Sequence, residues 1–167
     1  PTDGAVGLRQ QIQMAAAELD AHDIRLVDVG GDVLGRPGDP GLRSPFADAL
    51  TAAGCMNPVV ACRAWIAGPG LDGELAESLV LQRAGSTAVR HTLNAQMWKP
   101  YLSVLRWHPT EATALLASAT LGIRGTVEIR DAGLPVPLTE LSPSVLDIDM
   151  RTVQQANPLL SVLAHTT

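Results

Sequence analysis

The amino-acid sequence predicts an α/β fold with a mainly parallel sheet flanked by helices, and three observations support this. Two short apolar runs, at 24–29 and 59–67, have the length and β-branched content of buried strands. Each run is followed by a glycine-rich loop and then by a helical pattern, an order that is typical of βαβ units. The 167 residues suffice for one domain with its own core. We therefore expect a single Rossmann-like domain over residues 1–167.

Helical patterns surround the two predicted strands. Apolar residues recur at helical spacing over residues 4–20 and predict a helix before the first strand. The helix after the first glycine loop would begin at Ser44, a good N-cap residue, and close at Gly54. Leucines at positions 71, 75 and 79 place a third helix directly after the second glycine loop.

The second half of the chain continues this alternation of helices and strands. Proline interrupts one helical pattern because its ring cannot continue a helix, and glycine ends another. The predicted elements are a helix over 88–107 interrupted by Pro100, a helix from Pro109 to Gly122, strands at 126–129 and 145–148, and a last helix from Asn157.

Composition and charge limit the partners of the chain. Charged residues make up 17% of it, against about 25% in an ordinary soluble domain, and hydrophobic residues make up 46%. This apolar surplus predicts contact with another chain, in a homo-oligomer or with a second subunit or half-domain. The net charge of −5 repels nucleic acid, and no apolar run reaches the ~20 residues of a membrane span. We expect a cytoplasmic protein that binds neither nucleic acid nor membrane.

Two cysteines, Cys55 and Cys62, are present, and Cys62 lies inside the apolar run at 59–67. Cys62 is expected to be a buried thiol, and a disulfide is not expected because disulfides are rare in cytosolic proteins. Neither is assigned to a disulfide or to a metal site.

The two glycine-rich loops form the candidate ligand site. At the carboxyl edge of a parallel sheet the loops after adjacent strands lie side by side, and α/β folds bind ligands there. Glycine lets backbone N–H groups approach a ligand closely, and the helix after Ser44 would add a partial positive charge. This arrangement suits a phosphorylated or otherwise anionic small molecule. The residues assigned to ligand binding are Gly30, Gly31, Ser44, Asp72, Gly73 and Glu74.

Asp28 and Asp32 are the candidate catalytic residues. A carboxylate at a strand end can bind a hydroxyl group, an amine or a divalent cation, or take a proton when a neighbouring carboxylate raises its pKa. We expect Asp32 to orient the substrate or to act as a base. The alternative is that both aspartates accept hydrogen bonds in a turn and that Ser44 only caps a helix.

The glycine loops do not identify a cofactor. Neither DVGGD at 28–32 nor GPGLDGEL at 68–75 has the GxGxxG spacing of dinucleotide-binding loops or the Gly-Lys-Ser/Thr ending of a P-loop. The sequence assigns no cofactor and no metal ligand.

With LVDVGGDVL, LRSPFADAL and GPGLDGEL in this order, the chain resembles the prokaryotic family catalogued as domain of unknown function eleven fifty-two. The resemblance covers most of the chain and brings no established activity. Members of that family begin with a glycine-rich element that this chain does not contain, which implies that these residues are the C-terminal part of a larger α/β unit. The matched positions are Asp28, Gly30, Gly31, Asp32, Ser44, Asp48, Asp72, Gly73 and Glu74.

Taken together, the patterns predict an enzyme of small-molecule metabolism, a transferase or hydrolase, that binds an anionic metabolite at the strand-end loops. Two alternatives stay open. The apolar surplus equally suits a non-catalytic subunit or a ligand-sensing module. The loop aspartates would also suit a metal-dependent hydrolase, which is the weaker alternative.

Overall fold

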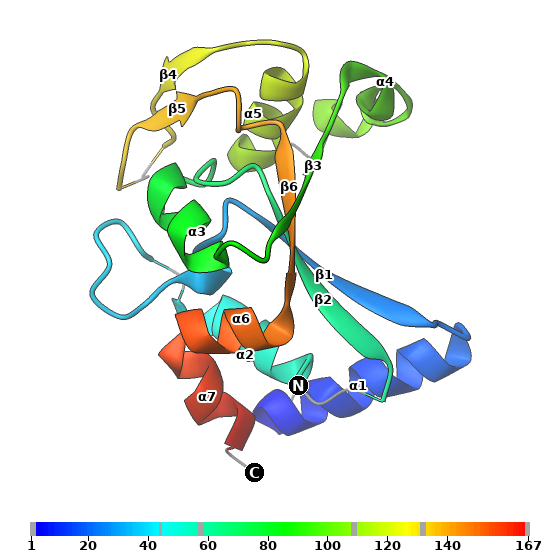
Figure 1. The fold of residues 1–167 in the computed structure, drawn as a ribbon. Coiled ribbons are helices and arrows are strands. Elements are labelled where there is room, and N and C mark those ends of the chain that lie inside the picture. Colours follow the sequence, from blue (N-terminus) through cyan, green and yellow to red (C-terminus); the bar gives the residue numbers. More distant parts are fainter. Residues whose placement is uncertain (1–2, 44, 57–58, 108–109, 131–132, 166–167) are drawn as a thin grey trace.

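The computed structural model describes residues 3–43, 45–56, 59–107, 110–130 and 133–165 (Figure 1). Its strands are β1 (Asp23–Val29), β2 (Ala61–Ala67), β3 (Val89–Thr92), β4 (Gly125–Val127), β5 (Val136–Leu138) and β6 (Ser144–Asp149). Its α-helices are α1 (Gly4–Glu18), α2 (Pro45–Gly54), α3 (Glu77–Ala84), α4 (Ala95–Trp98), α5 (Glu111–Thr120), α6 (Met150–Ala156) and α7 (Pro158–His165). Short 3-10 helices are η1 (Asp32–Leu34), η2 (Lys99–Tyr101) and η3 (Val104–Arg106).

The main sheet mixes parallel and antiparallel pairs. Within the described residues its strands lie in the order β1-β2-β6-β3, and β4 and β5 form a separate antiparallel pair. β1 and β2 are parallel, whereas β6 runs antiparallel to both β2 and β3. The α/β class is confirmed. The expectation of a mainly parallel sheet is corrected by the antiparallel β6, and a Rossmann-like architecture is not confirmed.

The direction of β6 follows from where the chain leaves and re-enters the sheet. β3 ends at Thr92, which lies opposite Ser144, the first residue of β6. Residues 93–143 therefore leave the sheet and return to it at the same end of its strands. In Figure 1, the elements α4, α5 and the β4–β5 pair of this segment lie at one end of the molecule. β6 begins at the end of the sheet where β2 and β3 finish, so it runs antiparallel to both of them.

Successive side chains of a strand point to opposite faces of the sheet, and the core therefore consists of two apolar clusters. Even-numbered residues of β2 and β6, among them Ile66 and Ile148, face the helices α2, α3, α6 and α7 and join the larger apolar cluster. Odd-numbered residues, among them Ala67 and Val145, face the opposite side and pack with Leu116 of α5 and the β4–β5 pair. The sheet is thus covered on both faces near the carboxyl ends of β1 and β2.

Several local predictions differ from the structure. The segment 88–107, expected to be helical, begins with β3, whose Val89 and Thr92 are β-branched, and only then forms the short α4 and two 3-10 turns. β5 and α6 were not predicted. The third helix begins at Glu77, later than predicted. Leu71 and Leu75, which were expected to belong to it, are buried residues of the preceding loop.

Helix ends follow local hydrogen bonds. The Thr110 hydroxyl oxygen accepts from the Thr113 N–H at 3.2 Å at the start of α5, and an Asp149 carboxylate oxygen accepts from the Thr152 N–H at 2.7 Å at the start of α6. Gly54 is the last residue of α2 rather than the residue after it. The predicted cap Ser44 and the predicted helix start Pro109 lie outside the described residues.

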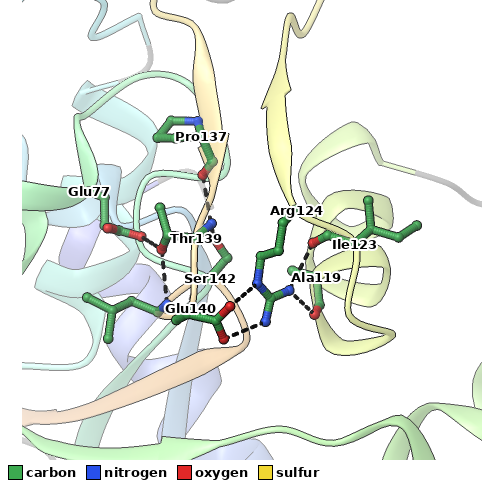
Figure 2. Close-up of polar contacts among 9 residues, drawn as sticks. Glu77, Ala119, Ile123, Arg124, Pro137, Thr139, Glu140 and Ser142 are labelled. Atoms are coloured by element: carbon green, nitrogen blue, oxygen red, sulfur yellow. Dashed lines mark hydrogen bonds and ion pairs between the residues drawn. The ribbon is translucent and has the colours of Figure 1, made fainter.

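Polar contacts attach the β4–β5 pair to the rest of the fold (Figure 2). The guanidinium of Arg124 binds both carboxylate oxygens of Glu140, at 3.0 and 3.1 Å, and also donates to the carbonyl oxygens of Ala119 and Ile123. Nearby, the Thr139 hydroxyl donates to Glu77 at the start of α3, at 2.6 Å. These bonds hold the segment between β5 and β6 against the end of α5 and the start of α3.

No helix in the described part of the chain is long and apolar enough to cross a membrane.

Candidate functional site

The site begins at the end of β1, where Asp28 precedes two glycines. Asp28 lies on the same face of β1 as Leu26, the face that is turned toward α2. Its carboxylate accepts hydrogen bonds from the Val33 N–H, at 3.1 Å, and from the Gly31 N–H. Gly30 and Gly31 have φ values of 118° and 108°, which L side chains rarely adopt, so the sharp turn into η1 needs glycine.

The loop after β2 lies directly against this turn, as the parallel pairing of β1 and β2 predicts. The Gly70 N–H donates to the Gly30 carbonyl oxygen at 2.6 Å, and the Gly30 N–H donates to the Ala67 carbonyl oxygen at 3.0 Å. A Cβ atom added to Gly30 would lie 2.1 Å from the Cγ atom of Asp72. The Asp72 carboxyl group therefore covers Gly30, in space that only a glycine leaves open.

Four aspartates line one cavity at this place, with a volume of about 350 Å³. Asp28 belongs to β1, Asp32 to η1, Asp48 to α2 and Asp72 to the 68–76 loop. Thr51, one turn beyond Asp48 on α2, adds a hydroxyl group, and Leu26 and Val27 supply apolar wall. The described residues that line the cavity include no lysine, arginine or histidine.

Burial and mutual repulsion raise the proton affinity of three of these carboxyl groups. Asp32 is only 8% exposed, and burial together with the charges of Asp28, Asp48 and Asp72 raises its pKa to about 10. Burial raises the pKa of Asp28 to about 6, although the Val33 N–H acts in the opposite direction. The pKa of Asp72 rises to about 7, chiefly through burial, while the Glu74 N–H lowers it.

Neighbouring carboxyl groups therefore differ in protonation at neutral pH. Asp32 keeps its proton and can donate a hydrogen bond, and Asp28 is mainly ionised. Asp72 lies near the midpoint of its titration, and its buried Oδ2 atom has no hydrogen-bond partner within the described residues. The cavity thus contains a proton donor, a proton acceptor and an unused acceptor atom.

The structure brings together only part of the predicted set. Asp28, Asp32 and Asp72 line the cavity, and Gly30 and Gly31 form the turn that connects Asp28 to Asp32. The Glu74 carboxylate instead accepts from the Arg43 N–H at 2.7 Å, and the Gly73 carbonyl accepts from the Leu134 N–H at 3.2 Å. Glu74 and Gly73 thus connect the 68–76 loop to neighbouring loops. Ser44 lies outside the described residues.

The glycine amides are engaged inside the protein. The Gly30 N–H is bound to Ala67, and the Gly31 N–H points to Asp28. A phosphate group at this turn would have to compete with both bonds and with the surrounding carboxylates. The two glycines contribute mainly by allowing the close approach of Asp72 and the turn into η1.

Asp48 and Thr51 are the cavity residues that the residue pattern did not predict. Their spacing of three places them on one face of α2. Asp48 is a matched position of the family resemblance, and this was the one available signal.

A metal site has no complete ligand set here. Among the described residues, no group of three or more histidine, cysteine, aspartate or glutamate side chains is placed to hold a metal ion.

Comparison with known proteins gives a family and no activity. The model of the family described as "Protein of unknown function (DUF1152)" matches residues 1–167. The chain belongs to the DUF1152 family. No curated protein and no solved structure matches it. For this DUF1152 chain the function must therefore be inferred from the geometry of the aspartate cavity.

Gly30→Ala tests the contact between the two loops, with Gly38→Ala as its matched control. Both glycines have positive φ, but a Cβ atom at Gly38 would meet nothing within 4 Å. We expect Gly38→Ala to cost about 1–2 kcal/mol of unfolding free energy through backbone strain alone. Gly30→Ala should cost a further ~1–3 kcal/mol, because the methyl group collides with Asp72. Urea denaturation measures both, and equal losses would show that the Asp72 contact contributes nothing.

Asp32→Asn should raise stability at alkaline pH. A carboxyl group with a raised pKa binds more protons in the folded than in the unfolded chain, so its contribution to the free energy of unfolding falls as the pH rises. For all three carboxyl groups this fall begins above pH 3.8, the ordinary pKa of aspartate. It ends near pH 6 for Asp28 and near pH 7 for Asp72, whereas for Asp32 it continues toward pH 10. We expect Asp32→Asn to exceed the wild type by more than about 1 kcal/mol at pH 8, with the difference vanishing near pH 4.

Asp39→Asn is a control in the same denaturation series, because its effect on the free energy of unfolding at pH 8 should have the opposite sign. Arg83 binds both Asp39 oxygens, at 2.5 and 2.7 Å, and lowers the pKa of that carboxyl group. Asp39→Asn should therefore be less stable than the wild type at pH 8. A similar pH profile for the wild type and Asp32→Asn would contradict the raised proton affinity of Asp32.

Proposed function

We propose that this chain is an enzyme of small-molecule metabolism whose aspartate cavity binds one metabolite and moves a proton on it. The observation that supports this is the convergence of four aspartates from four segments on one cavity of about 350 Å³. Raised pKa values of this kind cluster at functional sites, because packing alone gives no reason to bury carboxyl groups together. A volume of this size suits a single small metabolite.

The four aspartates have different proposed roles, which follow from their pKa values and positions. Asp32, with a pKa of about 10, would donate a hydrogen bond or a proton to the substrate. Asp28, with a pKa of about 6, would accept a proton as the base, held in orientation by the Val33 N–H. Asp72 and Asp48 would complete the polar wall and bind hydroxyl or amino groups.

The charge of the cavity decides which end of the substrate enters it. Ionised carboxylates without a lining cation repel an anionic group, so the inserted part of the substrate carries hydroxyl or amino groups. If the metabolite is phosphorylated or otherwise anionic, as the glycine loops suggested, its anionic group points out of the cavity toward solvent. The proposed substrate is therefore a polyol or an amine, or a phosphorylated derivative of either whose phosphate group lies outside the cavity.

A second candidate, the non-catalytic subunit, is favoured by the outer edge of β1. In the described residues β1 pairs with β2 alone, and its Val27 side chain is 59% exposed. We propose that another strand adds to this edge, from a second copy or a second subunit, and extends the main sheet. Sedimentation of the purified chain should then show a dimer, and a stable monomer at micromolar concentration would argue against pairing between two copies.

Ligand binding to Asp28→Asn tests the enzymatic proposal. Thermal unfolding of the wild type would be followed at pH 7 against matched sets of small polyols, amines and their phosphate esters. A compound that stabilises the wild type should bind Asp28→Asn at least about tenfold more weakly, because the ionised Asp28 carboxylate loses its charge and a hydrogen bond to a charged group contributes about 1.5–3 kcal/mol.

Asp23→Asn is the matched control for this experiment. Asp23 lies at the other end of β1, where its carboxylate pairs with Arg25 at 2.9 Å. Its substitution should leave ligand binding unchanged. Equal binding to the wild type and to Asp28→Asn would refute the assignment of the cavity as the substrate site.

A further inference from the structure

A second cavity, with a volume of about 330 Å³, is lined by the loop after η1 and by the helices α3 and α6. We call it the arginine cavity. The described residues that line it include two arginines and no aspartate or glutamate, and none of them also lines the aspartate cavity. Its charge is therefore opposite to that of the aspartate cavity. The polar lining residues are Arg36, Gln82, Arg83, Thr152 and Gln155.

Arg83 is held in place by the loop after η1. Its guanidinium donates to both carboxylate oxygens of Asp39, at 2.5 and 2.7 Å, and to the Leu34 carbonyl oxygen at 2.9 Å. The side chains of Arg83 and Asp39 are only 9% and 12% exposed. Asp39 thus balances the charge of Arg83, and Arg83 forms a fixed polar wall of the cavity.

Arg36 supplies a positive charge that takes part in no ion pair within the described residues. Its Nε atom donates to the Ala156 carbonyl oxygen at the end of α6, at 2.8 Å, and its backbone N–H donates to Asp39 at 2.6 Å. The Nε bond fixes the exposed side chain against α6. Both Nη groups have no hydrogen-bond partner in the described part of the chain, so the guanidinium keeps them for a ligand.

Two glutamine side chains add neutral donors from opposite helices. Gln82 belongs to α3 and Gln155 to α6, and neither side-chain amide forms a hydrogen bond with another described residue. An amide can donate to an anionic oxygen and can also accept from a hydroxyl group. Asp149, the acidic residue at the start of α6, caps that helix through the Thr152 N–H at 2.7 Å and does not line the cavity.

We propose that the arginine cavity binds the phosphate or carboxylate group of a small organic anion, with Arg36 as the charged contact and Gln82 and Gln155 as neutral donors. A guanidinium binds two oxygens of such a group through parallel N–H···O bonds. The volume falls in the range of small-molecule pockets, roughly 300–1,000 Å³, so the ligand is larger than the anionic group alone.

The alternative is that Arg36 only caps the end of α6. That role uses its Nε atom, and it does not account for a polar cavity without carboxylates in a chain of net charge −5. The site is also next to η1, because Arg83 binds the carbonyl of Leu34, the last residue of η1. The proposal does not rest on the proposed function, because the two cavities share no residue.

Isothermal titration of the purified 167-residue chain at pH 7 tests the proposal, with inorganic phosphate and succinate as probes. Sodium chloride at the same ionic strength is the reference for general salt effects. At least one of the two anions should bind saturably, and the comparison of the two shows whether the cavity prefers a phosphate or a carboxylate group. Absence of saturable binding of both would overturn the proposal.

Gln155→Glu and Gln154→Glu are a matched pair of variants that locate the binding. Each adds one carboxylate at a neighbouring position of α6, but only Gln155 lines the cavity. Gln155→Glu should weaken binding of the anion at least about tenfold through charge repulsion, whereas Gln154→Glu should bind nearly as the wild type does. Equal weakening in both variants would show a long-range charge effect only and would refute the site.

Arg36→Gln removes the charged contact and should also weaken binding at least about tenfold. Circular dichroism confirms folding, and the glutamine pair decides the matter if the loss of the bond to Ala156 unfolds this variant. Unchanged binding to a folded Arg36→Gln would contradict the proposal. Asp28→Asn should bind the anion as the wild type does, which separates this result from the test of the aspartate cavity.

Discussion

The hydrogen bond from the Gly70 N–H to the Gly30 carbonyl oxygen is the contact on which the site depends. It joins the loops that follow two parallel strands, and it brings the carboxyl group of Asp72 over the turn that carries Asp32. The close approach is possible because Gly30 has no side chain. Without it, Asp72 would no longer lie against the turn that carries Asp32, and the charge of Asp72 would no longer help to raise the pKa of Asp32.

The parts of the fold that sequence predicts best are those with local signals. β1, β2 and β6 were found within two residues of their boundaries, since apolar and β-branched residues fill them. β3 was mistaken for helix because all of its residues are exposed, so no alternation of burial marks it. The antiparallel direction of β6 could not be predicted, because it depends on where the long excursion through residues 93–143 returns to the sheet.

The site was predictable in position but not in composition. Parallel pairing of adjacent strands places their loops together, which brought Asp28, Asp32 and Asp72 to one cavity. Asp48 and Thr51 come from α2, and the sequence does not show that α2 packs beside the end of β1. Glu74 looked equivalent to Asp72 along the chain, yet a hydrogen bond to the backbone of Arg43 holds its carboxylate outside the cavity.

The place of β6 has a consequence for how the chain acquires its structure during synthesis. β6 leaves the ribosome after β1, β2 and β3, but it lies between β2 and β3 in the sheet. Until residues 144–149 are made, both neighbours expose unpaired backbone and apolar side chains, which favours aggregation or chaperone binding. Completion of the sheet therefore needs a long-range contact, and β6 is necessary for a site whose residues all lie between Leu26 and Asp72.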